Sequence, residues 1–358
     1  MKTLFLTLLT VLIMHYITKA QLVAEDARGE SSILLNASSI SLNLSEAALS
    51  ANWNNFRKLA VEKPHQMLWG IAARGSNSEG FSELFNGGQF TPQSRISGFI
   101  GLRSSYQNST FELLKRIRDI QASEDFPNEA AINTIKQLND QIKSIRSQQP
   151  SKALTTYINA GLNTDNFRRY TEENSSSLAA RFSKVSFRGA FVSAGLNYEY
   201  GRRWTFGVSA GYERYNNLDS LSARDYKLSN TAVIGNSQLS TETTYHAYAG
   251  EYIAYNRINF KTDALYFAKV SDDYRLVWNT LYTRIYLPLS ENRINRLVQA
   301  GTAINFYKSE GKFAGGLYAQ SDDLFNNLHS TDRFHERISF GIVAKYAFSS
   351  IMSRDFPK

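Results

Sequence analysis

The chain of 358 residues contains no cysteine. Disulfide bonds, thiolate metal sites and a lipid anchor on cysteine are therefore excluded. Long apolar runs are scarce too. The run Leu4–Met14 is shorter than the ~20 residues that a membrane-spanning helix needs, and no other run approaches its length. The net charge of +8 is scattered along the chain without a basic stripe, so nucleic acid is not expected as a partner.

The N-terminus has the order of a secretory signal peptide. Met1 and Lys2 are followed by the apolar run, and small residues around Ala20 offer a cleavage site. The pattern predicts that residues 1–20 are a signal peptide and that the mature chain is exported.

The most informative stretch is Ala190–Tyr215, in which apolar and polar residues alternate strictly on both sides of Gly201. Alternation indicates strands, because successive side chains point to opposite faces, and the short interruption predicts an antiparallel hairpin. One face is apolar with aromatic residues near the turn, and the other carries Gly, Ser, Asn and Glu. This division is typical of a membrane-spanning barrel, in which lipid lies outside and a polar lumen inside.

The same alternation recurs along residues 67–348. It predicts an all-β fold, specifically an antiparallel transmembrane β-barrel of about ten strands, or twelve if the N-terminal region or Gly315–Tyr318 contributes. A soluble β-sandwich is the alternative, but its outward face would be charged. The predicted strands are Met67–Arg74, Arg95–Ser104, Ala153–Asn163, Ala190–Tyr200, Trp204–Tyr215, Thr243–Tyr255, Ile258–Val270, Arg275–Leu289, Val298–Phe306 and Phe334–Phe348.

The connections predict a topology. Tight turns after Tyr200, Tyr255 and Ser290 are expected at one, periplasmic, end. Four long connections and the short Ser271–Asp273 are then outer loops. The long connections are Asn77–Ser94, Thr164–Arg188, Asn216–Glu242 and Ser309–Arg333.

Residues 105–151 interrupt the strands with a helical pattern. Ser109 and Glu112 form a capping box, and two apolar stripes are separated by Pro127. We expect a periplasmic two-helix insertion. Its apolar seams either bury against each other and cap the barrel mouth, or offer a docking site for a periplasmic protein.

Together, the signal peptide, the cysteine-free chain, the alternating strands and the aromatic segment FHERISFGIVAKYAF resemble outer-membrane β-barrel proteins of Gram-negative bacteria. Strands such as AGLNYEYG and AGTAINFY resemble uncharacterised barrels of Bacteroidota. The resemblance implies localisation in the cell outer membrane, with membrane lipid and the barrel assembly machinery as partners. Residues 21–66 are expected to be a periplasmic arm or plug, or else extra strands, and residues 349–358 a C-terminal tail.

The residues predicted to face the lumen carry charges of both signs. Mixed charges form cross-strand pairs, which favours a closed or narrow lumen over a pore selective for one sign. These residues are Arg103, Glu199, Glu213, Glu251, Lys261, Asp263, Lys269, Arg284, Arg337 and Lys345.

Catalytic signals are weak. Asp272, Asp273, Asp332 and His335 are the candidates for a rim site of the kind that barrel proteases use. However, His335 is three positions after Asp332, which places the two on opposite faces of a strand. The histidines are not spaced as metal ligands, so no metal and no cofactor are expected. The sequence therefore favours a non-enzymatic structural or interaction barrel. A narrow channel for small polar solutes and a hydrolase are the alternatives.

Overall fold

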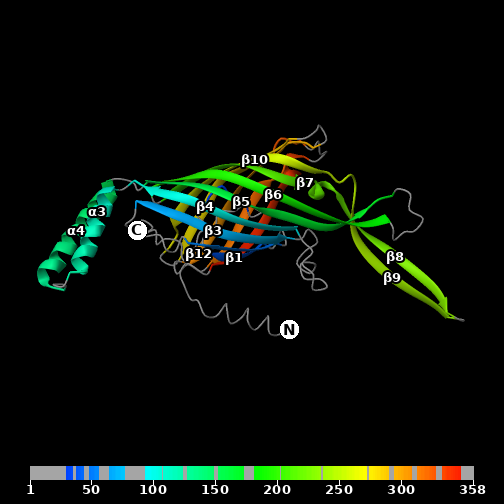
Figure 1. Cartoon of the computed structure of the whole chain (residues 1–358), viewed down its shortest axis with the longest axis horizontal. Coiled ribbons are helices and arrows are strands. Elements are labelled where there is room, and N and C mark those ends of the chain that lie inside the picture. The colour runs from blue at the N-terminus through cyan, green and yellow to red at the C-terminus, as the bar shows by residue number, and fades with distance from the viewer. Residues whose placement is uncertain are drawn as a thin grey trace.

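The computed structural model describes fifteen segments of the chain: residues 30–34, 38–43, 48–55, 64–76, 93–106, 108–123, 127–148, 152–172, 181–201, 203–234, 237–271, 274–289, 294–308, 313–327 and 333–347. They form an antiparallel sheet and two helices (Figure 1). The predicted all-β class is confirmed. The predicted signal peptide and C-terminal tail lie outside the described residues.

The elements follow one another along the chain with few interruptions. The strands are β1 (Ser39–Asn43), β2 (Ala48–Asn54), β3 (His65–Ser76), β4 (Gln93–Ser105), β5 (Lys152–Tyr170), β6 (Phe182–Tyr200), β7 (Trp204–Asn216), β8 (Ser222–Ile234), β9 (Ser237–Ala249), β10 (Ala254–Lys269), β11 (Tyr274–Pro288), β12 (Leu297–Lys308), β13 (Phe313–Ser321) and β14 (Ile338–Ala347). The helices are α3 (Asn108–Gln121) and α4 (Glu129–Gln148), with short 3₁₀ turns η4 (Leu218–Ser220) and η5 (Phe334–Arg337).

The strands form one sheet of fourteen, in the order β4-β3-β2-β1-β14-β13-β12-β11-β10-β7-β6-β5-β9-β8. In addition, β4 pairs with β5 in antiparallel register from Ser94↔Thr164 to Ser105↔Ala153. The twelve strands other than β8 and β9 therefore form a closed circuit of pairings, in which each strand has a partner on both edges. Such a circuit satisfies the backbone hydrogen-bonding groups that a sheet edge leaves exposed.

The strand count is higher than predicted. Both regions that the sequence left open contribute, since β1 and β2 come from the N-terminal region and β13 contains Gly315–Tyr318. The predicted long loop Asn216–Glu242 contains β8 and the first part of β9, which pair from Ser222↔Ala249 to Ile234↔Ser237. This hairpin meets the twelve-strand circuit through a short parallel pairing of β9 with Arg169 and Tyr170 of β5.

The predicted strand Thr243–Tyr255 and the turn after it are wrong. Gly250, with φ of 130°, ends the alternation just after β9, and β10 begins at Ala254. Arg257 therefore lies inside β10, opposite Glu213 of β7, instead of in a turn. Its charge resembled a turn signal, but it is accommodated in the strand by an ion pair with that glutamate.

Because of this error, the connections that follow β10 and β11 lie at the opposite ends of the sheet from those predicted. The predicted turn at Gly201 is confirmed, since Tyr200 pairs with Trp204 and the glycine has φ of 61°, which favours residues without a β-carbon. Tyr266 pairs with Trp204, so β10 ends at the same end of the sheet as this turn. Residues around Ser271 thus lie at the end predicted to be periplasmic, and not in an outer loop.

The predicted two-helix insertion is present between β4 and β5. Its seams bury against each other: Ile117, Leu138 and Ile142 form a small core. The side-chain oxygen of Asn128 accepts a hydrogen bond from the Ala131 N–H at 2.7 Å, which caps the start of α4. Figure 1 shows the hairpin of α3 and α4 at one end of the molecule and the hairpin of β8 and β9 at the other.

The two faces of the sheet are inverted relative to those of a soluble protein. Large apolar side chains on the outer face are exposed, whereas charged side chains on the inner face are buried. Exposed examples are Trp69, Ile71, Ile96, Ile100, Ile158, Leu162, Val192, Val208, Phe260, Leu281, Leu317, Phe340 and Ile342.

Neither helix in the described part of the chain combines the length and the apolar character that crossing a membrane would require.

Candidate functional site

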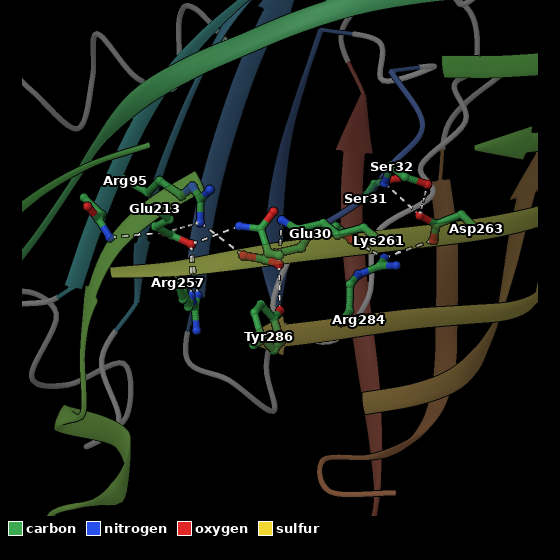
Figure 2. A network of polar contacts seen from close by, with 12 residues as sticks. Glu30, Ser31, Ser32, Arg95, Glu213, Arg257, Lys261, Asp263, Arg284 and Tyr286 are labelled. Carbon is green, nitrogen blue, oxygen red and sulfur yellow. Dashed lines mark hydrogen bonds and ion pairs between the residues drawn. The ribbon is translucent and has the colours of Figure 1, made fainter. Parts of the chain in front are cut away.

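The candidate site lies on the inner face, where residues 30–34 are held against the strands (Figure 2). The Glu30 carboxylate is bound from several sides. Lys261 Nζ lies 2.7 Å from Oε2 and Arg95 Nη1 lies 3.1 Å from Oε1, and the Tyr286 hydroxyl donates a hydrogen bond at 2.9 Å. Burial acts to raise the pKa of Glu30, but Lys261, Arg95 and Arg257 outweigh it and hold that pKa well below its usual range.

Ser32 is the second anchor of the segment. Its backbone N–H and its hydroxyl both donate to Oδ2 of Asp263, at 2.7 and 2.6 Å. Its carbonyl accepts hydrogen bonds from the Tyr157 hydroxyl at 2.8 Å and from Nδ2 of Asn197 at 2.6 Å. Asn197 Oδ1 also accepts from the Leu34 N–H at 3.0 Å, so side chains of the strands bind the backbone of the segment.

Glu213 of β7 is the most heavily bonded carboxylate of the strands. It is fully buried and pairs with Arg257 Nη2 at 3.0 Å and with Arg95 Nη1 at 3.4 Å. The side-chain amides of Asn163 and Asn259 donate to it as well. A buried carboxylate needs this number of partners, because its desolvation is costly.

Asp263 and Arg284 form a second buried pair, with Nη2 3.0 Å from Oδ1 and both side chains inaccessible to solvent. Nδ2 of Asn279 donates to the same carboxylate oxygen at 2.9 Å. Arg284 Nη2 also donates to the Glu30 carbonyl at 2.9 Å, which connects this pair to the N-terminal segment.

A third pair lies at the end of β4. Nε and Nη2 of Arg103 donate to the two carboxylate oxygens of Glu199 at 3.2 and 3.1 Å, and Nη1 donates to the Ser105 hydroxyl. The bidentate geometry holds both side chains in a fixed orientation.

Six of the ten predicted lumen residues are therefore buried on the inner face. Glu251 lies between β9 and β10, Lys269 ends β10, and both are exposed. Arg337 lies in η5, where Nη1 donates to the Asp323 carbonyl. Lys345 lies in β14 opposite Ser41, and its side chain is outside the described part.

Sequence reasoning missed Glu30, Arg95, Arg257 and Asn279. Arg95 is the first residue of a predicted strand, and the alternation of that strand alone would have placed it on the same inward face as Arg103. Asn279 was missed because the β10–β11 register shifts between Ala264 and Leu265, which reverses the parity that strict alternation assumes.

Of the four predicted catalytic residues, only His335 lies in the described part of the chain. Asp272, Asp273 and Asp332 lie outside the described residues. Ser271 and Tyr274, which flank the first two, are at the end where β10 stops, whereas His335 precedes β14 at the opposite end, because neighbouring strands are antiparallel. His335 is exposed, with Nε2 3.9 Å from Glu336.

Another histidine has a carboxylate partner. Nδ1 of His246 on β9 lies 2.8 Å from Oδ1 of Asp225 on β8. The described segments contain no group of three or more histidine and carboxylate side chains that could hold a metal ion.

Comparisons of the chain with protein-family models and with curated proteins find no match. The arrangement of the side chains is therefore the basis for the functional proposal.

Proposed function

We propose that the chain is a transmembrane β-barrel of a Gram-negative outer membrane, whose lumen is closed by its own N-terminal segment. The observation that carries the proposal is the inversion of the two faces: Ile96 and Phe340 are 64% and 76% exposed on the outer face, while Glu213 and Arg284 are fully buried on the inner face. Lipid stabilises such an outer face, and a polar interior tolerates such an inner one.

The closed circuit of twelve pairings supports the same proposal. In a bilayer the backbone groups of an open sheet edge would find no partner, so strands span membranes only as closed barrels. The hairpin of β8 and β9 then extends beyond the membrane, where its backbone groups are hydrated.

Inside the barrel, the Glu30–Leu34 segment and the ion pairs around it fill the lumen. Twelve strands lie between the roughly eight whose interior wall side chains alone fill and the roughly 16–18 that leave an aqueous channel, so the segment occupies space that the wall leaves. We infer a structural or interaction role instead of catalysis, with membrane lipid and the barrel assembly machinery as partners. The short turn at Gly201 lies at the same end of the sheet as the α3–α4 hairpin. Short turns of such barrels are periplasmic, so we assign the α3–α4 hairpin to the periplasm.

The proposed membrane location is tested by substituting two isoleucines whose side chains are similarly exposed, one on a strand and one on a helix. Ile158 on β5 is 55% exposed and Ile132 on α4 is 52% exposed. In a bilayer, Ile158→Arg places a charge in hydrocarbon and is expected to cost about 2–4 kcal/mol of folding free energy. Ile132→Arg is expected to have little effect, because α4 lies outside the membrane.

The measurement is denaturant titration of the mature protein folded into lipid vesicles, followed by the gel shift between heated and unheated samples. Equal tolerance of both substitutions, or a protein that folds in water and stays out of vesicles, would contradict a membrane location.

A further inference from the structure

The contacts of residues 30–34 are those of a bound ligand. None of these residues belongs to a strand of the sheet. Instead, side chains from β4, β5, β6, β10 and β11 converge on the segment and bind the Glu30 carboxylate and successive backbone groups. Figure 2 shows those that come from β4, β10 and β11.

The inner face also leaves room for this segment. Ser32 and Ile33 are almost fully buried, at 0% and 1% exposure. A β-carbon at Gly207 of β7 would collide with Cγ1 of Ile33 and lie 2.7 Å from the Ser32 hydroxyl oxygen. A glycine at this position therefore admits the segment.

The charge of the cluster depends on Glu30. Four cationic side chains, Arg95, Arg257, Lys261 and Arg284, share the cluster with the carboxylates of Glu30, Glu213 and Asp263. With the segment displaced, the four cations would share only two carboxylates. An exogenous carboxylate would then meet a lysine, arginines and the Tyr286 hydroxyl, already positioned.

We propose that the inner face carries a recognition site for carboxylate anions, and that residues 30–34 occupy this site as a displaceable built-in ligand. The inference rests on the proposed function, since it needs a lumen that solutes can enter. Displacement converts the closed barrel into a narrow, anion-preferring path. The ligand is a free organic acid or an acidic peptide, which share the carboxylate.

The test uses single-channel recording of the mature protein in planar bilayers. One variant replaces residues 30–34 by a Gly/Ser segment of equal length, and a second is Glu30→Gln, which keeps the shape and removes the charge. Glu112→Gln, at an exposed position on α3, is the matched control. We expect the replacement to open steady conductance with chloride preferred over potassium, Glu30→Gln to raise the frequency of openings, and Glu112→Gln to behave as the unaltered protein.

Block of the opened variant identifies the ligand. The probes are sodium citrate and a synthetic peptide with the sequence of residues 29–34. The peptide should block, and its Glu→Gln form should block about tenfold more weakly, as loss of a charge-assisted contact implies. Lys261→Met in the opened variant should weaken block by every carboxylate probe. Block by citrate as well as peptide indicates free acids, and block by the peptide alone indicates an acidic peptide.

Folding is checked separately by the heat-dependent gel shift. Inserted, heat-modifiable variants that stay silent, that prefer potassium, or that both peptides block equally would overturn the inference and leave the membrane proposal standing. A protein that never inserts would instead overturn the proposed function, and the inference with it.

Discussion

At the scale of single residues, the inner face carries buried charges, several of which have more than one partner. Glu213 shows why. Its carboxylate is fully buried and bound by Arg257 and Arg95. Removing one partner of a buried pair leaves the other desolvated and uncompensated, whereas an exposed pair is screened by water.

Glu213→Gln is therefore expected to lower the free energy of unfolding by about 3–5 kcal/mol. Glu242→Gln removes a single ion pair, with Lys227, from the exposed hairpin, and is expected to cost less than about 1 kcal/mol. Urea titration in vesicles, followed by tryptophan fluorescence, measures both. Similar costs for the two variants would show that Glu213 is hydrated.

Alternation alone assigned Glu213, Lys261 and Asp263 to the inner face, and these side chains are buried there. It could not place Asn279, because the register shift between β10 and β11 reverses parity locally. It also could not find Glu30. A segment that forms no strand has no periodicity, and its place depends on partners more than sixty residues away in the sequence.

At the scale of elements, the hairpin of β8 and β9 is nearly independent of the twelve-strand circuit. The strands pair with each other along their whole length, whereas backbone pairing with the circuit is confined to Arg169 and Tyr170. Aromatic and cation–π contacts with Phe167, Arg168 and Phe182 add to this junction. At its base Tyr226 stacks on Tyr170, with ring centroids 4.3 Å apart. This hairpin could not be predicted from the sequence, because its strands are rich in Ser and Thr and lack the alternation of apolar and polar residues that indicates a strand.

Replacing residues 222–249 by a short Gly/Ser linker is expected to leave folding of the circuit intact, since the loss is confined to two backbone pairings and to side-chain contacts at one end of β5 and β6. The heat-dependent gel shift and the melting temperature of the variant measure this. A variant that no longer shows the gel shift would mean that the hairpin is needed to complete the sheet.

At the scale of the whole molecule, the two hairpins mark opposite ends. The sequence predicted the helical one correctly, because both apolar stripes and the proline between them are local signals. It assigned several later connections to the wrong ends, because one mistaken strand before Arg257 reverses the predicted direction of the next three strands, until the unpredicted β13 restores it for β14. In an antiparallel sheet the direction alternates from strand to strand, so one mistaken strand affects those after it until a second miscount cancels the first.

The absence of cysteine makes the orientation testable. Lys227→Cys on β8 and Lys143→Cys on α4 introduce single thiols at positions whose side chains are 72% and 80% exposed. A membrane-impermeant maleimide is expected to label the first variant in intact cells and the second only after permeabilisation. The reverse pattern would invert the proposed topology, and labelling of both in intact cells would contradict it.

Residues 30–34 are joined to β1 by a short link, and the length of this link affects how a soluble ligand would compete with them. Only the link from Leu34 to Ser38 separates the bound segment from the start of β1. A ligand on so short a link is presented to its site at an effective concentration on the order of millimolar or above. A free acid must therefore be abundant, or must bind through several carboxylates, before it can compete. The length of this link sets the threshold at which the lumen would respond to solutes around it.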